Sequence, residues 1–287
     1  MKILCVDIGN NLTKLCIFDI APNNTNTLAE KFSESNYEMG KVYTLLTSKC
    51  TSESYVRTAL NALNLSQIKV NSVVISCVMA DALEPFTRAI QTITELTPFV
   101  VTAQTKNMLV GAPDFTGGDI IATANYIIGQ NYGTPAAAFV LGTASVCINI
   151  VPQNSADGNL CGRLDGCLIW SGVNTATEAL TDKCAALPEI NLKKPTKFLA
   201  ENTIECIENG IYYSTIGGIE HIANKFTQHN LTHQIDENHV TDTKFLISGG
   251  CANVFKDAFD NKMELVDNIV LRGLCTIFIY NGYNQNN

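Results

Sequence analysis

The sequence predicts an α/β protein with two similar halves that face each other across a cleft. Apolar runs rich in strand-forming residues alternate along the chain with segments of helical periodicity, which is typical of α/β folds. Two of the runs, residues 3–18 and 136–150, share one layout: a strand, a turn containing glycine, and a returning strand. We expect a first domain at residues 1–106 and a second at residues 107–287.

The composition is that of a folded protein with a sizeable core, because 46% of the 287 residues are hydrophobic and 16% are charged. The net charge of −8 argues against nucleic acid or an anionic membrane as the main partner. We find no apolar run of bilayer-spanning length and no signal-peptide pattern. The eleven cysteines lack zinc-site spacing, so we expect reduced thiols in a cytoplasmic protein.

The first half opens with a strand at residues 3–6, a polar turn at 7–11 and a returning strand at 15–18. Later elements are assigned by helical periodicity or by short runs of β-branched residues. We expect a loop at 22–36, helices at 43–63 and 81–94, and strands at 72–78 and 99–102.

The second half repeats this alternation. A capping box at residues 175–178 predicts a helix that begins there and ends before Pro188. We also expect a loop at 111–118, a helix at 119–130, the hairpin at 136–150, strands broken by glycine at 158–169, a mostly helical stretch at 196–226 interrupted near Gly210 and Gly217-Gly218, a strand at 244–248 leading into a diglycine turn, and a helix at 269–280.

The opening turn has the residue types of a phosphate-binding site. Gly9 can adopt a positive φ and let the backbone approach a bulky anion. Asp7, at the end of a buried strand, can hold a hydrated Mg²⁺ beside phosphates, and Thr13 and Lys14 can donate hydrogen bonds. An ordinary hairpin turn explains the same residues, because Asp, Asn and Gly are common in turns. Similar turns at residues 142–145 and 248–252 favour the binding interpretation.

These blocks, in this order, resemble the type III pantothenate kinases, which belong to the actin and sugar-kinase superfamily. The resemblance covers nearly the whole chain and implies two ribonuclease-H-like domains. Its motifs are Asp7-Ile8-Gly9-Asn10, Gly117-Gly118-Asp119, Gly142-Thr143-Ala144, Gly166 with Gly172, Leu187-Pro188, Asn202-Thr203 and Ser248-Gly249-Gly250.

The resemblance implies ATP-dependent phosphorylation of pantothenate, the first step towards coenzyme A. It also implies a homodimer that requires Mg²⁺ and a monovalent cation, K⁺ or NH₄⁺. Asp119 would be the general base, and Asp7 would hold Mg²⁺ through water. The implied ATP phosphate ligands are Asp7, Gly9, Asn10, Asn11, Thr13, Lys14 and Thr143. The pantothenate contacts are Gly117, Gly118, Asp119 and Thr203, and Gly249 and Gly250 lie beside the adenosine.

For three of these residues an ordinary structural explanation stands beside the implied role. Asp119 follows two glycines at the front of a helix, where Asp is a preferred cap. Gly142-Thr143 fits a simple hairpin, and the Thr203 hydroxyl can bond back to a preceding helical turn.

The sequence departs from the family pattern inside the site. The family has an arginine directly after the catalytic Asp, whereas this sequence has Ile120. The change removes a bidentate donor to anions. Where the family has the acid that ligates the monovalent cation, this sequence has Val140, so the cation site is in doubt. Further changes are Asn11, Gly111, Val146, Ile148, Cys167 and Ser171. Two alternatives therefore stand beside the pantothenate kinase: a kinase of this fold for another small hydroxyl substrate, and a non-catalytic nucleotide-binding relative.

Overall fold

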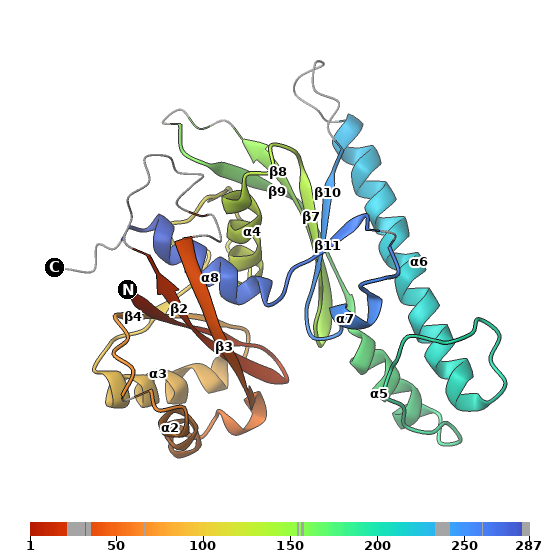
Figure 1. Cartoon of the computed structure of the whole chain (residues 1–287), viewed down its shortest axis with the longest axis horizontal. Helices are drawn as coiled ribbons and strands as arrows, with labels where there is room; N and C mark the ends of the chain where they lie inside the picture. Colours follow the sequence, from red (N-terminus) through yellow and green to blue (C-terminus); the bar gives the residue numbers. More distant parts are fainter. Residues whose placement is uncertain are drawn as a thin grey trace. The chain divides into compact units, whose positions relative to one another are not determined.

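The computed structural model describes residues 1–21, 32, 36–65, 67–153, 155, 158–232, 242–259 and 261–282. These residues form two β-sheets and their covering helices (Figure 1). Contacts within the chain divide it into two compact units. Unit 1 comprises residues 1–131, 152–163 and 269–287, and unit 2 comprises residues 132–151 and 164–268. This division assigns residues 107–131 to the first unit, whereas the sequence predicts a domain boundary at 106.

The first sheet has five strands in the order β3-β2-β1-β4-β5. β1 pairs antiparallel with β2 and parallel with β4. The outer pairs are β2 with β3, antiparallel, and β4 with β5, parallel. The strands are β1 (Lys2–Ile8), β2 (Leu12–Ile20), β3 (Tyr37–Leu46), β4 (Ser72–Cys77) and β5 (Phe99–Val100).

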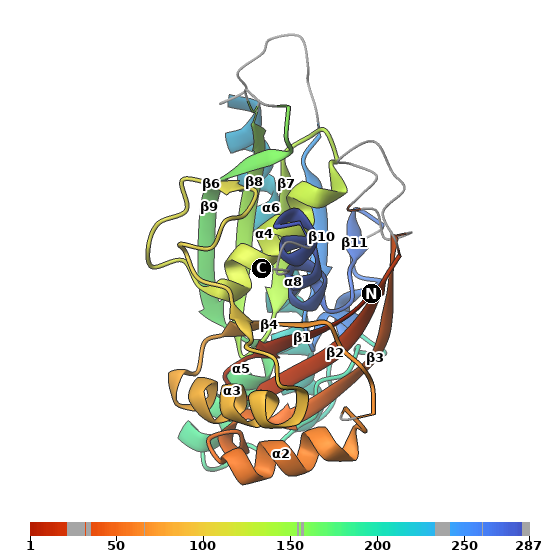
Figure 2. The ribbon, with the colours of Figure 1, turned by 90° about the vertical axis from the view of Figure 1, so that its left-hand side faces the viewer.

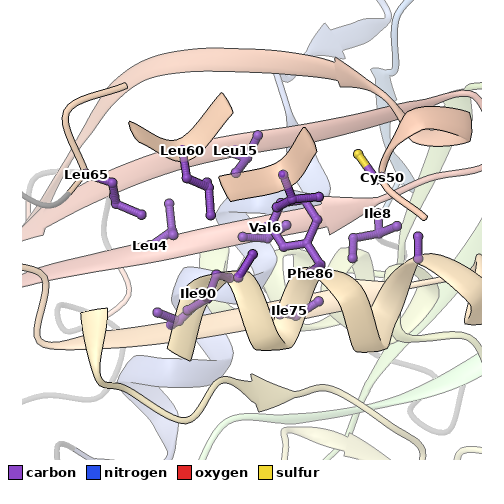
Figure 3. Packing of buried hydrophobic residues seen from close by; sticks show 14 of the residues in the cluster. Leu4, Val6, Ile8, Leu15, Cys50, Leu60, Leu65, Ile75, Phe86 and Ile90 are labelled. Carbon is purple, nitrogen blue, oxygen red and sulfur yellow. The ribbon is translucent and has the colours of Figure 1, made fainter. Parts of the chain in front are cut away.

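One face of this sheet packs against α2 (Glu53–Ala62) and α3 (Ala80–Thr94). Leu4, Val6 and Ile8 alternate with residues of the other face, as a strand requires, and they meet Leu60 of α2 and Phe86 of α3 (Figure 3). Each of these side chains is at most 2% exposed. A cluster of this kind stabilises the unit by removing apolar surface from water.

The opposite face is covered by α4 (Gly118–Gln130) and α8 (Ile269–Tyr280) (Figure 2). The two helices cross closely, because a Cβ on Gly273 would lie 1.8 Å from the Ala122 carbonyl oxygen. Cys275 of α8 lies near Cys5 of β1, and burial together with this thiol raises the pKa of Cys5. The two helices therefore close the face of the sheet that carries Ile3, Cys5 and Asp7.

The second sheet repeats the strand plan of the first, in the order β11-β10-β7-β8-β9-β6. β7 pairs antiparallel with β8 and parallel with β10, and β10 pairs parallel with β11. In this plan β7 corresponds to β1, β8 to β2 and β10 to β4, which confirms the expectation of two similar halves. The strands are β6 (Leu109–Val110), β7 (Ala136–Leu141), β8 (Ala144–Gln153), β9 (Cys161–Ser171), β10 (Lys244–Ser248) and β11 (Met263–Leu265).

The described residues of the second unit include the helices α5 (Val173–Lys183), α6 (Thr203–Thr232) and α7 (Ala252–Phe255). Buried residues of α6, among them Tyr212 and Phe226, pack with Phe139 of β7 and Phe255 of α7. A buried Asn149–Asn230 pair, with nitrogen–oxygen distances of 2.7 and 3.1 Å, also joins β8 to α6. No helix within the described ranges has both the length and the apolar character needed to cross a membrane.

Three expectations about single elements were wrong. The helix expected at 43–63 is strand β3 up to Leu46, followed by a 3₁₀ turn, Thr47–Lys49, and α2. Tyr43 and Leu45 pack against the core as alternate strand residues paired with β2. The helical stripe that suggested the longer helix, Val56 and Leu60, belongs to α2 alone. Helix α6 is not interrupted at its glycines, because a helix tolerates glycine at a modest cost.

The third error is the capping box. Helix α5 begins two residues earlier than expected, with Gly172 as its N-cap. Thr175 lies inside the helix, and its hydroxyl donates to the Thr143 carbonyl oxygen at 2.8 Å. A contact with the β7–β8 turn therefore replaces the local capping bond.

Candidate active site

Asp7 is the last but one residue of β1 and lies half-buried within the strand, where the sequence predicted a turn. Its cross-strand partner on β2 is Lys14, and its partner on β4 is Ser76. Because residues paired across strands point to the same face of a sheet, all three side chains lie on the face covered by α4 and α8.

The turn after Asp7 is tight. The Gly9 N–H donates to the Leu12 carbonyl oxygen at 3.2 Å, and a Cβ on Gly9 would lie 2.8 Å from that oxygen. Gly9 does not have a positive φ, so the expected reason for glycine was wrong. This position needs glycine because two backbone segments approach closely. Asn10 and Asn11 are exposed at the turn, and the Asn11 carbonyl accepts a hydrogen bond from the Thr47 N–H at 3.0 Å.

Thr13 lies apart from the Asp7 group. It pairs with Ile8, so its side chain points to the opposite face of the sheet, towards the core under α2. The hydroxyl is fully buried and hydrogen-bonds the Thr47 hydroxyl at 2.9 Å. The structure thus gives the Thr13 side chain a structural partner, whereas Lys14 lies on the face of Asp7.

The start of α4 packs directly against the first sheet, at Ser76 of β4 and at Val101, which follows β5. A Cβ on Gly118, the first residue of the helix, would lie 2.7 Å from the Val101 carbonyl oxygen and 3.3 Å from Ser76 Oγ. Any larger residue would push the helix away, because contacts below 3.0 Å force atoms to shift. Glycine at position 118 therefore brings Asp119 to the end of β1 and β4.

Asp119 is not the N-cap residue, because Gly117 takes that position and its backbone is extended. The carboxylate turns back over the helix start, since a Cβ on Gly117 would lie 2.5 Å from Asp119 Oδ1. Burial raises the pKa of Asp119, and hydrogen bonds from the backbone N–H groups of Ile120 and Asp119 partly oppose this. The helix N-terminus thus fixes a carboxylate that keeps an elevated pKa.

Asp7 and Asp119 are 112 positions apart in sequence (119 − 7), yet their charges interact. Burial raises the pKa of Asp7 to about 7, the negative charge of Asp119 adds to the rise, and the Lys14 ammonium opposes it. Two carboxylates that share a partly buried site repel each other when both are ionised. A cation or a group with hydrogen-bond donors would relieve this repulsion.

The donor set fits Mg²⁺ held together with phosphates. Carboxylate oxygens suit this hard ion, which usually takes one or two protein carboxylates and keeps waters and phosphate oxygens as its other ligands. Among the described residues no group of three or more His, Cys, Asp or Glu side chains could hold a metal alone. The chain therefore offers part of a coordination shell, and a nucleotide would supply the rest.

In the second unit the β7–β8 turn carries Thr143. Its carbonyl oxygen accepts from the Gly172 N–H at 2.9 Å and from the Thr175 hydroxyl at 2.8 Å. A Cβ on Gly172 would lie 2.0 Å from the Gly142 carbonyl oxygen, so glycine is required for this crossing. The turn is thus held rigidly by the start of α5, while the Thr143 side chain is half-buried.

Val140 occupies the place in β7 that Asp7 has in β1. It pairs with Val146 on β8 and with Ser248 on β10, as Asp7 pairs with Lys14 and Ser76. Two of the departures from the family pattern are therefore one apolar cross-strand pair. The hairpin repeats the layout of the opening stretch without its charges, as the sequence predicted.

The diglycine turn follows β10. Gly249 has φ +102°, and a Cβ there would lie 2.4 to 2.6 Å from backbone atoms of Leu141. Gly250 has no atom within 4 Å of its Cβ position and is exposed. Gly249 is thus required by the fold, whereas Gly250 leaves open space beside the backbone.

Thr203 is the exposed first residue of α6, so no helical turn precedes it for its hydroxyl to bond. The preceding Asn202 accepts the Glu205 N–H through its Oδ1 at 3.0 Å. Thr203 belongs to unit 2 together with Thr143, Gly249 and Gly250, while Asp7, Lys14 and the Gly117-Gly118-Asp119 segment belong to unit 1.

A family model described as type III pantothenate kinase matches residues 3–225, which is more than three quarters of the chain. The chain belongs to the type III pantothenate kinase family. As a member of this family it is a transferase for the ATP-dependent phosphorylation of pantothenate, the first step of coenzyme A biosynthesis.

Two similar proteins are type III pantothenate kinases of Bifidobacterium. The one from Bifidobacterium animalis subsp. lactis is 27% identical over 97% of this chain and 99% of its own length. The one from Bifidobacterium adolescentis is 28% identical over 97% and 98%.

A solved structure with a similar fold comes from Campylobacter jejuni and is described as a Baf family transcriptional activator. Its TM-score is 0.52 and its sequence identity 12%, with 97% of this chain and 98% of that chain covered. This likeness concerns the fold alone. It agrees with the two-sheet α/β architecture described above.

Sequence reasoning missed Ser76. It lies in an apolar strand run, where a hydroxyl has no role in packing, and this mismatch was the available signal. Only strand pairing shows that Ser76 stands beside Asp7.

We expect the free energy of unfolding of the ligand-free protein to fall as the pH rises from 4 to 7. The folded-state pKa of Asp7 is about 7 and the unfolded value is about 3.9. The folded state therefore holds this proton over that range while the unfolded state loses it. In urea titrations Asp7→Asn should reduce the fall by on the order of 1–4 kcal/mol.

The matched control is Asp19→Asn, because Asp19 is exposed and its pKa is lowered by the Lys2 ammonium. This variant should keep the wild-type fall between pH 5 and 7. Parallel profiles for wild type and Asp7→Asn would contradict the electrostatic account of the site.

Proposed function

We propose that the site around Asp7 and Asp119 transfers the terminal phosphoryl group of ATP to the hydroxyl of pantothenate. The observation that carries this proposal is the pair of interacting carboxylates, which the start of α4 and the end of β1 hold together. Phosphoryl transfer depends mainly on positioning and charge neutralisation. Asp7 supplies charge for a cation, and Asp119 supplies a proton acceptor.

Asp119 is the general base in this proposal. A base works best when its pKa lies near the operating pH, and burial raises the pKa of Asp119 in that direction. The hydrogen bonds from the helix N-terminus orient the carboxylate, so one oxygen can accept the hydroxyl proton as the oxygen–phosphorus bond forms. The backbone of Gly117 and Gly118 would lie beside the pantothenate.

Asp7 would hold Mg²⁺ through water, and the ion would neutralise charge on the ATP phosphates. Lys14 adds a positive charge on the same face. Asn10 and Asn11 are exposed residues of the tight turn at Gly9, and their backbone N–H groups could donate to phosphate oxygens. Any contribution of Thr13 would come from its backbone, because its hydroxyl is bonded to Thr47.

In unit 2 we propose a phosphate contact for Thr143, a pantothenate contact for Thr203 and an adenosine surface at Gly249 and Gly250. The open space at Gly250 and the rigid turn at Thr143 support these roles. An acceptor other than pantothenate is the second candidate, favoured by Ile120, which is half-buried beside Asp119 and offers no charge to an anionic substrate.

We expect the purified protein to release ADP from Mg·ATP only when pantothenate is present. Asp119→Asn should lower this rate by about 10²- to 10⁴-fold, the usual contribution of a general base, without abolishing ATP binding. A coupled ADP assay and titration calorimetry measure the two properties. The matched control is Asp114→Asn, because Asp114 is exposed in the preceding loop, and it should retain the wild-type rate.

ADP release with another small alcohol, but none with pantothenate, would show that pantothenate is not the acceptor and would leave the proposed site unchanged. Full activity of Asp119→Asn would overturn the role of this residue. Folded protein without turnover and without ATP binding would overturn the kinase proposal.

We further propose that the reaction does not depend on a monovalent cation. The resemblance implies such a dependence, but Val140 and Val146 form an apolar pair at the place of the implied ligand, and apolar side chains do not bind K⁺. The rate should stay within about twofold when choline chloride is replaced by KCl or NH₄Cl. Ionic strength is held constant so that the screening of charges is the same in all three salts. A severalfold stimulation by K⁺ would contradict this proposal.

We propose a homodimer formed through the exposed apolar residues before and at the start of α6. Phe198 and Leu199 are 68% and 76% exposed. Asn209 Nδ2 donates to the Phe198 carbonyl oxygen at 2.7 Å, so this segment is fixed to α6. The Phe198 ring also packs edge-on against Tyr213, with a centroid distance of 5.1 Å. Ordered apolar surface of this kind marks interfaces.

Sedimentation should show a dimer for the wild type and a monomer for Phe198→Asp/Leu199→Asp, because two buried charges oppose association. The control is Leu231→Asp, an exposed position near the other end of α6. A wild-type monomer at micromolar concentration would contradict the proposal. The cytoplasm is the proposed compartment, in agreement with eleven free thiols.

A further inference from the structure

Ser76 lies in the first sheet and has no role in the mechanism described so far. It is the fifth residue of β4 and fully buried. Its partner across the parallel pair β1–β4 is Asp7. Partners in adjacent strands are about 4.8 Å apart and point to the same face, so the hydroxyl of Ser76 is directed to the side of the Asp7 carboxylate.

The hydroxyl of Ser76 makes no hydrogen bond with any described residue. A buried donor without a partner destabilises the fold, and such groups in native proteins call for an explanation. The carboxylate of Asp7 likewise receives no hydrogen bond within the described part of the chain, although Lys14 attracts its charge. The Ser76 hydroxyl, which lacks an acceptor, thus lies beside the Asp7 carboxylate, which lacks a donor.

The start of α4 closes over the same point. The Cβ position of Gly118 lies 3.3 Å from Ser76 Oγ, and Asp119 follows Gly118. Ser76 therefore lies between the strand that carries Asp7 and the helix that carries Asp119. Asp119 accepts from the N–H groups of Ile120 and Asp119, whereas Asp7 has no such donor among the described residues.

We propose that Ser76 is a positioning residue, whose hydroxyl donates to the Asp7 carboxylate when Mg·ATP binds and thereby fixes its orientation. The step changes only hydrogen bonding, and no covalent bond changes. This inference rests on the proposed binding of Mg·ATP at Asp7. Ser76 would hold the Asp7 carboxylate from the neighbouring strand β4. Hydrogen bonds that orient a metal-binding side chain commonly contribute strongly to metal affinity.

The second sheet offers an internal comparison. Ser248 takes the register place of Ser76, but its β7 partner is Val140. A serine at this place therefore faces a carboxylate only in the first sheet. The serine can support an acid in unit 1, whereas in unit 2 no acid stands opposite it.

The experiment compares wild type, Ser76→Ala and Ser72→Ala. Ser72 is also buried, lies on the same strand and face as Ser76, and pairs with Ile3 instead of an acid. Calorimetry measures ATP binding over a series of Mg²⁺ concentrations, and thermal unfolding is followed without ligand. Steady-state rates at saturating Mg²⁺ separate kcat from the Mg²⁺ requirement.

For Ser76→Ala we expect the Mg²⁺ concentration at half-saturation of ATP binding to rise roughly tenfold, with kcat restored at high Mg²⁺. The Tm of the ligand-free variant should equal or exceed that of wild type, because the substitution removes an unpaired buried hydroxyl. Ser72→Ala should keep the wild-type Mg²⁺ dependence.

A wild-type Mg²⁺ dependence in Ser76→Ala would overturn the inference and leave the proposed function intact. A clear loss of Tm in the free variant would also overturn it, because the hydroxyl would then have a partner in the fold. Absence of Mg²⁺-dependent ATP binding in the wild type would overturn the proposed function, and the inference with it.

Discussion

The seating of the first residue of α4 against the first sheet is the constraint on which the site depends. Gly118 lets the helix approach the Val101 carbonyl so closely that a Cβ would lie 2.7 Å from it. This approach brings the Asp119 carboxylate near Asp7 and partly buries both. Burial and like charge then raise the pKa of Asp7 to about 7. The chemistry of the site is thus a consequence of how one helix packs.

The two sheets share one strand plan but differ in chemistry. In the first, Asp7 is flanked by Lys14 and Ser76, and in the second, Val140 is flanked by Val146 and Ser248. The backbone plan is kept because it depends on strand pairing and tight glycine turns. The two sheets can differ in charge because these side chains are not part of the hydrophobic packing. Type III pantothenate kinases use this fold for phosphoryl transfer. In this member the two interacting carboxylates, Asp7 and Asp119, both lie in the first unit.

Much of the fold could be predicted from the sequence, since the opening hairpin, α3, α4 and α8 follow strong local patterns. The errors occurred where tertiary contacts replaced local ones. Residues 43–46 were assigned to the helix that follows them, but they pair with β2 as a strand. Thr175 looked like a helix cap but bonds the Thr143 carbonyl. The phosphate role of Thr13 stays a prediction for its backbone, because a strand period of two turns its hydroxyl to the other face.

The sequence by itself determined the family, the order of the strands and helices, and the residue types of the site, because these depend on local patterns and on motifs in a fixed order. Only the tertiary structure decided that Asp7 and Asp119 interact, that Ser76 stands beside Asp7, and that Val140 and Val146 form one pair. These relations join residues that are distant in sequence or belong to different elements. They follow from strand register and helix packing, which no single stretch of sequence specifies.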